Sequence, residues 1–291
     1  MEAVDFSPTS SANSTRCTFQ RDARLCFEMH MTLREWQKRR LVELRGRKFR
    51  QSQHSRLMTL IAYAFPCDVE SEAFDWIECA VLQSWAVLGA LKTTLVVHRD
   101  FCKVKQFAAA YPDWVDVQIE TSLEPGKIET MSADCNNRLH SRFDTPYCLV
   151  IQDDGFPLQN TLDEFLGKYD FIGAPYVRIA CWRNLVCRVL GLWVSNGGFS
   201  LRSKRICEAA AYWWNRKYRN LHPCEATVDD LYYTRTLPIH HPSFRFQFKI
   251  ADNRAALRFS YDDIVKQPIT KLPFGFHRAS TFEALQFPLI G

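Results

Sequence analysis

The segment Ser195–Ser203, which reads SNGGFSLRS, decides how the rest of the chain is interpreted. It follows the apolar residues Leu185–Val194 and precedes Lys204–Trp214, whose composition is typical of a helix. Adjacent glycines have no Cβ, so they allow a backbone turn with positive φ and the close approach of a ligand. The simplest interpretation is a tight turn into a helix, and a ligand site is the alternative. Carboxylates on either side of the segment bear on that choice.

Apolar runs alternate with helical patterns along the first two thirds of the chain. The predicted strands are Arg56–Ala64, Lys92–Arg99, Trp114–Ile119, Thr145–Gly155 and Tyr169–Tyr176. The predicted helices are Val69–Leu91, Val104–Ala110, Lys127–Phe143, Leu162–Lys168 and Lys204–Trp214, with a further one near Cys224–Leu237. Strands and helices that alternate in this way indicate βαβ units and a parallel sheet.

Charge is concentrated near the beginning of the chain. The net charge is +5, but Arg34–Arg50 holds eight basic and two acidic residues, so the rest is close to neutral and gives no charge argument for nucleic acid. Three interpretations of residues 31–50 remain open: a solvated extension, a helix that docks on the body, or a contact with an anionic membrane or RNA. We expect residues 1–55 to form a flexible basic extension and residues 56–291 to form one domain.

Cysteine usage and the absence of apolar leader segments bear on the compartment. The chain has eleven cysteines, an odd number, and no Cys-x-x-Cys pair. This pattern argues against a disulfide framework or a zinc site and favours a reducing compartment. The N-terminus lacks an apolar signal region, and no run of ~18 apolar residues is present. We therefore expect a cytoplasmic protein.

Two aspartates end the predicted strand Thr145–Gly155, where the sequence turns from apolar residues to Gln-Asp-Asp-Gly. Ligands of parallel sheets bind beyond the carboxyl ends of the strands. There Asp153 and Asp154 can hold a hard divalent cation and leave coordination positions for phosphate oxygens. The alternative is an Asx turn, which Asp and Gly also favour.

A second pair, Asp229 and Asp230, lies near the start of the helix predicted around Cys224–Leu237. A carboxylate at a helix N-terminus is typical of a cap. Two adjacent acids exceed what one cap requires, so the other carboxylate is a candidate general base.

His277 lies in PFGFHR, between aromatic residues and an arginine. Its imidazole can complete a metal site or contact a phosphate, and the alternative is a partly buried histidine bonded to a carbonyl. Walker, Gly-x-Gly-x-x-Gly, His-Glu-x-x-His and Gly-x-Ser-x-Gly motifs are absent from the sequence. Their absence argues against ATPases, dinucleotide oxidoreductases, zinc proteases and α/β-hydrolases.

Five motifs in this order resemble those of a family of GT-A-like glycosyltransferases, known mainly as a domain of unknown function. The family motifs are Gln-x-Asp-Gly-Phe, Tyr-Asp-x-Ile-Gly-Ala-Pro-aromatic, Gly-Asn-Gly-Gly-Phe-Ser-Leu-Arg-Ser, Glu-Asp and Phe-Gly-Phe-His. They are matched by Gln152–Phe156, Tyr169–Tyr176, Asn196–Ser203, Asp229-Asp230 and Phe274–His277. Ser195 replaces the first glycine of the third motif, and Asp229 replaces Glu. The apolar insert Val177–Val194 is long for this resemblance, which covers roughly residues 56–277.

The resemblance implies a nucleotide-sugar-dependent transferase of the hexosyltransferase type. Its fold would be α/β, with a GT-A-like, Rossmann-type mixed but mainly parallel sheet flanked by helices. Asp154, with Asp153, and His277 would hold Mn²⁺ or Mg²⁺ against the donor diphosphate. Asp230, with Asp229 beside it, would be the catalytic base if the reaction inverts the anomeric centre. The donor-binding residues implied are Gln152, Asp153, Gly155, Asn196, Gly197, Gly198, Ser200 and Arg202.

The resemblance leaves the partners and two other functions open. The acceptor is a glycan, a lipid or a protein, no nucleic acid is expected, and residues 31–50 are a candidate for peripheral membrane contact. Gln152 occupies the first place of an Asp-x-Asp triplet, which keeps open a non-catalytic protein that binds a nucleotide or sugar. The remaining alternative is a protein that acts on nucleic acid or membrane through residues 34–50.

Overall fold

A computed structural model of the chain describes residues 31–64, 73–99, 102–175, 195–218, 229–262, 271–278 and 280–282. The apolar insert predicted at residues 177–194 lies outside the described residues. Among those described, no helix is long and apolar enough to cross a membrane.

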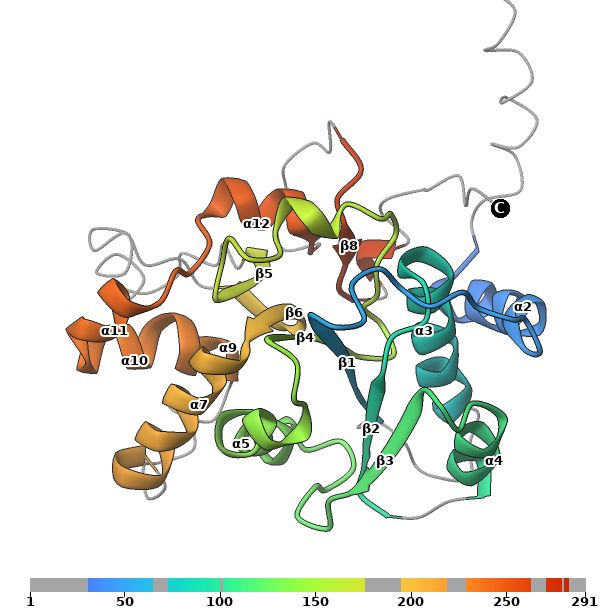
Figure 1. Ribbon diagram of the computed structural model, residues 1–291, viewed down its shortest axis with the longest axis horizontal. Coiled ribbons are helices and arrows are strands. Elements are labelled where there is room, and N and C mark those ends of the chain that lie inside the picture. Colours follow the sequence, from blue (N-terminus) through green and yellow to red (C-terminus); the bar gives the residue numbers. More distant parts are fainter. Residues whose placement is uncertain are drawn as a thin grey trace, which may run out of the picture.

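A six-stranded sheet runs through the centre of the molecule (Figure 1). Its strands are β1 (Met58–Tyr63), β2 (Thr93–Val97), β3 (Val115–Ile119), β4 (Tyr147–Ile151), β5 (Phe171–Pro175) and β6 (Ser195–Ser203). The order is β3-β2-β1-β4-β6-β5, with β1 to β4 parallel and β6 antiparallel to both of its neighbours. This mixed, mainly parallel sheet confirms the predicted fold class.

Helices cover both faces of the sheet. The α-helices are α2 (Leu33–Leu44), α3 (Ala73–Leu88), α4 (Cys102–Ala110), α5 (Ile128–Asn137), α7 (Lys204–Trp213), α9 (Asp229–Leu231), α10 (Leu237–His240), α11 (Pro242–Gln247) and α12 (Asn253–Phe259). Alternate residues of β1 divide between the two layers, with Leu60 packed toward α3 and α4 and Ile61 toward α5 and α7. Because both faces are covered, β1 and β2 are buried along their whole length, which explains their continuous apolar sequences.

Short elements complete the fold. They are the 3₁₀ turns η2 (Leu139–Arg142) and η3 (Leu162–Glu164), the π-helical turns η4 (Trp214–Tyr218) and η5 (Tyr232–Thr236), and the paired strands β7 (Ser260–Tyr261) and β8 (Gly275–Phe276). Two predicted helices are therefore shorter than expected. The segment 127–143 divides into α5 and η2, and the segment 162–168 holds only η3 before Gly167 adopts a positive φ of 78°.

The tight turn expected at Ser195–Ser203 is wrong, because this segment is strand β6. Phe199 and Leu201 point into one core, whereas Ser200 and Arg202 point to the other face, which is the period-two pattern of a strand. The register with β5 shifts between Gly173 and Ala174, so residues 197–199 form an irregular part of β6. The adjacent glycines therefore lie in a bulge-like irregularity next to the site, and neither has a positive φ.

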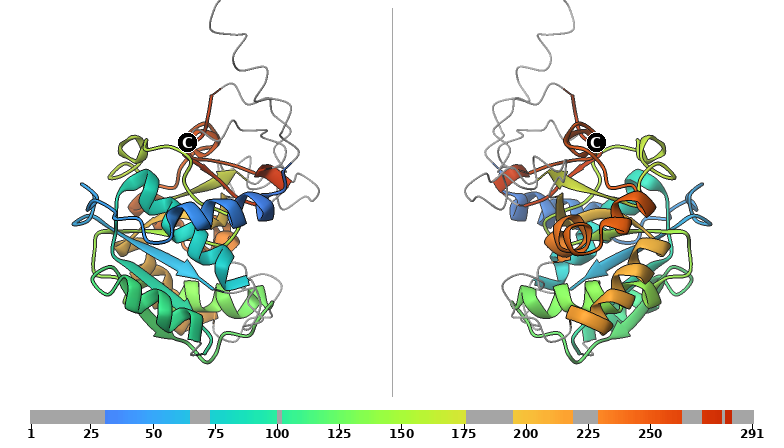
Figure 2. Two further views of the ribbon diagram at one scale, coloured as in Figure 1. Left: turned by 90° about the vertical axis from the view of Figure 1, so that its right-hand side faces the viewer. Right: turned by 90° about the vertical axis from the view of Figure 1, so that its left-hand side faces the viewer.

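The flexible extension expected up to residue 55 is wrong for residues 33–54. Helix α2 lies against α3 (Figures 1 and 2) and buries its apolar stripe, with Trp36 stacked on Phe156 at 5.4 Å. A capping box between Thr32 and Glu35 begins the helix. Docking on the body is thus the interpretation that the structure shows for this helix, although its four buried apolar residues stand among many charges and give a weak signal.

Candidate functional site

A pocket of about 250 Å³ opens beyond the carboxyl end of β4. Five segments meet there: the start of α5, the loop after β4, the irregular part of β6, the start of α9 and the end of β8. The pocket is lined by Ile128, Met131, Gln152, Asn196, Gly197, Gly198, Asp229, Asp230, Leu231, His277 and Arg278. The structure therefore brings together residues from four of the five sequence motifs.

The short pairing of β7 with β8 places His277 at the pocket. Tyr261 pairs with Phe276, so the next residues, Asp262 and His277, lie side by side. The Nδ1 atom of His277 is 3.5 Å from an oxygen of Asp262, and its Nε2 atom is 3.2 Å from Oε1 of Gln152 and 3.7 Å from Oδ1 of Asp154. Burial favours the neutral ring, but the carboxylates of Asp262 and Asp154 outweigh burial and raise the pKa of His277.

Asp262 is a site residue that the sequence did not reveal. Its side chain is buried and accepts a hydrogen bond from Nδ2 of Asn196 at 3.0 Å. The Oδ1 atom of Asn196 in turn accepts from the backbone N–H of Gly198 at 2.9 Å. Asn196 thus ties the irregular part of β6 to the carboxylate that faces Nδ1 of His277. Only the β7–β8 pairing, which joins residues distant in sequence, makes this arrangement visible.

The two acids after β4 point in different directions. Asp153 is buried and turned toward α2, where Nη2 of Arg34 donates to it at 2.5 Å and Gln37 donates to its backbone carbonyl at 2.6 Å. Burial and then the charge of Asp154 raise the pKa of Asp153, against the opposing charge of Arg34. Asp154 is more exposed and faces His277. The predicted donor-binding residue Asp153 is therefore a link to α2 and does not line the pocket.

Arg202 lies beneath the pocket floor and not in its lining. Its guanidinium is fully buried between the rings of Phe171 and Tyr233, at 5.2 and 4.9 Å from their centres. It donates to a carboxylate oxygen of Asp229 and, at 3.1 Å, to the carbonyl of Gly197. The ion pair compensates the buried charge of Asp229 and holds it at the base of the pocket.

Ser200 is likewise buried beneath the floor. Its hydroxyl donates to the Gly197 carbonyl at 2.8 Å and accepts from Nε of Arg202 at 3.0 Å. Ser200 therefore supports the backbone of the predicted donor site from below and does not reach the cavity.

Asp230 is the acid of this pair that is partly open to the pocket. The backbone N–H of Leu231 donates to its Oδ1 atom at 2.6 Å. Burial, followed by the charge of Asp229, raises its pKa to about 7. A carboxylate with a pKa near neutrality exchanges protons readily at physiological pH, as a general base requires.

The glycines of β6 make room for the side chains of the site itself. A Cβ on Gly197 would lie 2.5 Å from Oδ2 of Asp229, and one on Gly198 would lie 2.2 Å from Nε2 of His277. A Cβ on Gly155 would come within 3.1 Å of the ring of His277. Any side chain at the first two positions would displace an acid or the histidine, which gives these glycines a reason other than space for a sugar.

Arg278 and the apolar side of the pocket also escaped the sequence analysis. Among the described residues other than glycine, Arg278 has the one positive φ, 81°, and its N–H donates to the carbonyl of Asp154 at 2.8 Å. Such a backbone conformation is costly for a side-chain residue and is commonly retained at functional sites. Ile128 and Met131 of α5 form an apolar wall, where Gln152 contacts the sulfur of Met131 at 3.2 Å.

The predicted metal ligands Asp154 and His277 face each other. No group of three or more His, Cys, Asp or Glu side chains within the described ranges is arranged to hold a metal ion. The carboxylate of Asp262 behind His277 is nevertheless the arrangement that commonly orients a metal-bound histidine. The two side chains fit a cation whose other coordination positions are filled by phosphate oxygens and water, as is usual for Mg²⁺.

The family described as "Protein of unknown function (DUF5672)" matches residues 128–277. The chain belongs to this family. The matched range covers more than half of the chain and, apart from Arg278, every residue that lines the pocket. The prediction that this chain belongs to a family known as a domain of unknown function is thereby confirmed, and the chain is called the DUF5672 protein below. Comparison with curated proteins finds no match.

Several solved structures of glycosyltransferases are distantly similar to the DUF5672 protein. The mannosyltransferase PcManGT from Pyrobaculum calidifontis, in complex with GDP-Man and Mn²⁺, is 12% identical over 72% of this chain and 59% of its own, with a TM-score of 0.38. The glycosyltransferase GlyE from Streptococcus pneumoniae is 11% identical over 76% and 54%, with a TM-score of 0.43. The galactosyltransferase LgtC, with donor and acceptor sugar analogues, is 11% identical over 81% and 97%, with a TM-score of 0.47.

The chain thus spans between half and two thirds of the length of the first two of these proteins. The identities are 11–12% and the TM-scores are below 0.5, so these similarities carry no argument about function. A function has to be argued from the site itself.

Proposed function

We propose that this DUF5672 protein is a glycosyltransferase that moves a sugar, a hexose by its resemblance, from a nucleotide-sugar donor to an acceptor hydroxyl. One observation supports this proposal most strongly: a carboxylate with a pKa of about 7, Asp230, shares a pocket with His277, which faces Asp154. Glycosyl transfer needs both a base for the acceptor and positive charge near the leaving diphosphate, and separate side chains meet the two needs.

Asp230 acts on the acceptor. In its ionised form it accepts the proton of the acceptor hydroxyl while the hydroxyl oxygen bonds to the anomeric carbon of the donor. The bond between that carbon and the diphosphate oxygen breaks with its electron pair, and the nucleoside diphosphate leaves. The buried charge of Asp229 helps to keep the pKa of Asp230 close to the working pH.

The leaving diphosphate is bound on the other side of the pocket. Asp154 and His277 would hold Mn²⁺ or Mg²⁺ there, and a bound cation supplies positive charge to the departing phosphate oxygens. Asp262 faces Nδ1 of His277 at 3.5 Å, and Gln152 hydrogen-bonds Nε2 of the same ring. Asn196 fixes the backbone of Gly197 and Gly198 along the pocket, where the donor sugar would lie.

Turnover with defined donors tests this proposal. The purified chain is incubated with UDP- and GDP-linked hexoses and Mn²⁺, and release of the nucleoside diphosphate and the thermal shift are measured. We expect one donor to raise the melting temperature and to be hydrolysed slowly even without an acceptor. A folded sample that shows neither effect with any donor of the panel would contradict the proposal.

Gln152 supports a second candidate function. An amide stands where an Asp-x-Asp triplet has its first acid, and its Oε1 atom contacts His277. A protein with fewer acidic ligands can bind a nucleotide or sugar without transferring it. Calorimetric binding of a nucleoside diphosphate, combined with no turnover of any donor, would favour this function over catalysis.

A further inference from the structure

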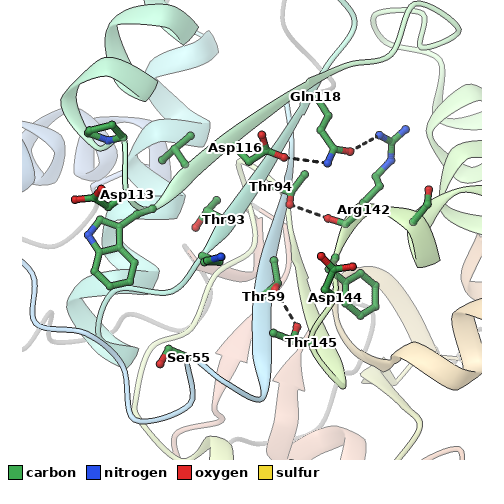
Figure 3. Close-up of a pocket in the computed structure, with 16 residues that line it drawn as sticks. Ser55, Thr59, Thr93, Thr94, Asp113, Asp116, Gln118, Arg142, Asp144 and Thr145 are labelled. Carbon is green, nitrogen blue, oxygen red and sulfur yellow. Dashed lines mark hydrogen bonds between the residues drawn. The ribbon is translucent and has the colours of Figure 1, made fainter.

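A second pocket, of about 510 Å³, is shown in Figure 3. Its lining residues place it at the opposite end of the sheet. Strands β1 to β4 are parallel, so their amino ends gather at one edge, and the pocket is lined by residues of those ends and of the loops before them. The candidate active site lies beyond the carboxyl end of β4. The two pockets therefore open at different ends of the same strands.

The floor of the second pocket is polar because polar side chains recur on one face of the strands at their amino ends. In the register of the sheet, Ile61 pairs with Thr94 and Thr94 pairs with Asp116. Side chains on one face recur every second residue, so Thr59 and Gln118 share this face with them. Toward the carboxyl ends the same face is apolar and packs against α5. The change from apolar to polar residues along the strands marks a cavity that no helix among the described residues fills.

The polar groups of the floor are held in place by hydrogen bonds, which Figure 3 shows. Oγ1 of Thr94 donates to the carbonyl of Arg142 at 2.8 Å, and Nη1 of Arg142 donates to Oε1 of Gln118 at 3.0 Å. The amide of Gln118 then donates to Asp116 at 3.0 Å, and the hydroxyls of Thr59 and Thr145 are bonded at 2.9 Å. Because these hydrogen bonds already fix the side chains of the floor, a ligand that bonds to their oxygen atoms would cause little further loss of side-chain entropy.

The charge of this pocket disfavours anions. The guanidinium of Arg142 is already paired with Asp134 and, at 3.2 Å, with Glu120. Around the rim, the exposed side chain of Lys92 stands against three exposed carboxylates, which are Asp113, Asp116 and Asp144. Phosphates and nucleotides would be repelled by this excess of negative charge, whereas carboxylate oxygens readily accept hydrogen bonds from neutral hydroxyl groups.

Aromatic side chains complete the lining. Trp114 and Phe143 line the pocket. Trp114 is half-buried and also packs against the core on the α3–α4 side, whereas Phe143 is buried beneath Lys204, so Trp114 is the aromatic side chain that a ligand could reach. An aromatic wall beside convergent polar groups is typical of small-molecule sites, and the volume lies within their usual range of roughly 300–1,000 Å³. A sugar ring presents an apolar C–H face and a rim of hydroxyls, which match an aromatic wall and acidic acceptors respectively.

We propose that this second pocket binds a neutral saccharide, apart from the pocket in which transfer would occur. The side chains that contact the ligand are Trp114 and Asp116, on a floor held by Gln118. The proposal concerns binding alone, so it stands or fails independently of the transferase activity.

Binding of lactose, maltose and cellobiose to the full chain tests the proposal, by saturation-transfer NMR and then calorimetry. The anionic counterpart of lactose is 3′-sialyllactose. We expect at least one of the neutral disaccharides to bind. Asp116→Ala and Trp114→Ala should each weaken binding by about tenfold or more, because a hydrogen bond to a charged group and an aromatic contact are lost.

Matched controls are Glu43→Ala, an exposed acid of α2, and Phe246→Ala, an exposed aromatic of α11. Both should bind as the parent does. Asp116 is exposed, so its substitution should leave the melting temperature unchanged and separate binding from folding. The proposal is overturned if none of the three disaccharides binds at millimolar concentration. It is also overturned if the two pocket variants bind as tightly as the controls, or if sialyllactose binds as tightly as lactose.

Discussion

The two aspartate pairs of the candidate site are built on the same plan, at different depths in the molecule. In each pair the first acid is buried and bonded to an arginine: Asp153 to Arg34 and Asp229 to Arg202. The second acid, Asp154 or Asp230, is more exposed and faces the site. Neighbouring side chains project in different directions, so adjacent acids seldom serve one ligand together. Under the proposed function, Asp154 and Asp230 would carry the chemistry, and the residue before each would support it.

The pairs differ in what holds the supporting acid. Arg202 is fully buried between two aromatic rings, whereas the side chain of Arg34 is 39% exposed on α2. Removing Arg202 takes away the buried cation that compensates Asp229. Removing Arg34 also leaves a buried acid, Asp153, but the lost cation is one that solvent already reaches. The five predictions below separate support from chemistry in this comparison.

The largest effect is expected for Asp230→Asn. The amide cannot accept the acceptor proton, so kcat should fall by about 10²–10⁴-fold. Steady-state release of nucleoside diphosphate measures this loss, and circular dichroism checks that the variant is folded. A folded variant with kcat within a factor of about two of the parent would exclude Asp230 as the base.

Arg202→Met tests the deep support. The methionine keeps an apolar stem between the rings but leaves Asp229 as an uncompensated buried charge. The free energy of unfolding should fall by about 3–5 kcal/mol in urea denaturation. Adding Asp229→Asn to this variant should restore part of the loss. A double variant no more stable than Arg202→Met alone would argue against the ion pair as the cause.

Asp154→Asn and Asp153→Asn compare the chemical acid with its support. If Asp154 binds the cation, its loss should weaken Mn²⁺-dependent nucleotide binding by at least about 10–100-fold, the effect typical of changing a residue that only supports a metal ligand. Asp153→Asn should retain the affinity, because this side chain faces α2. Calorimetric titrations with and without Mn²⁺ supply the measurement. Equal losses of nucleotide affinity in the two variants would contradict the proposal that Asp154 binds the cation and Asp153 does not.

The pH dependence of kcat/KM tests whether Asp230, the more exposed acid of its pair, is the base. Asp230 has a raised pKa of about 7, so the ionised base is fully present above that pH and is lost as the pH falls below it. The rate should therefore drop about tenfold per pH unit on the acid side and level off on the alkaline side. An acid limb centred near pH 4, the ordinary range of a carboxyl, would show that Asp230 does not limit the reaction.

The smallest effect is expected for Arg34→Met. Its carboxylate partner is buried, but the arginine itself is half-exposed, so solvent screens the pair and the free energy of unfolding should fall by only about 1 kcal/mol. Gln37 still holds the backbone of Asp153 in this variant. If the free energy of unfolding fell as much as in Arg202→Met, the half-exposed Arg34 would stabilise the protein as much as the buried Arg202, which would contradict this comparison.

Much of the sheet follows from the sequence because its signals are local. Strands β1 and β2 are continuous apolar runs, which only burial between two layers of helices explains. The sequence predicts a turn or a ligand site at Ser195–Ser203 and does not predict strand β6, because Gly197 and Gly198 favour turns and the antiparallel partners β4 and β5 lie far away in the sequence. Helix α2 was underestimated for a similar reason, since its few apolar residues stand among many charges.

The sequence by itself determined the α/β class, the order of the motifs and which acids to examine, because periodicity and residue type report on local burial and chemistry. The tertiary structure alone decided that Asp154 faces His277 while Asp153 turns toward α2, and that Asp230 is the more exposed acid of its pair. It also decided that Asp262 lies beside His277 and that the glycines of β6 make room for side chains. Each of these depends on a contact between residues distant along the chain, such as Arg34 with Asp153. Such contacts have no local pattern; they exist only once strands pair and helices pack.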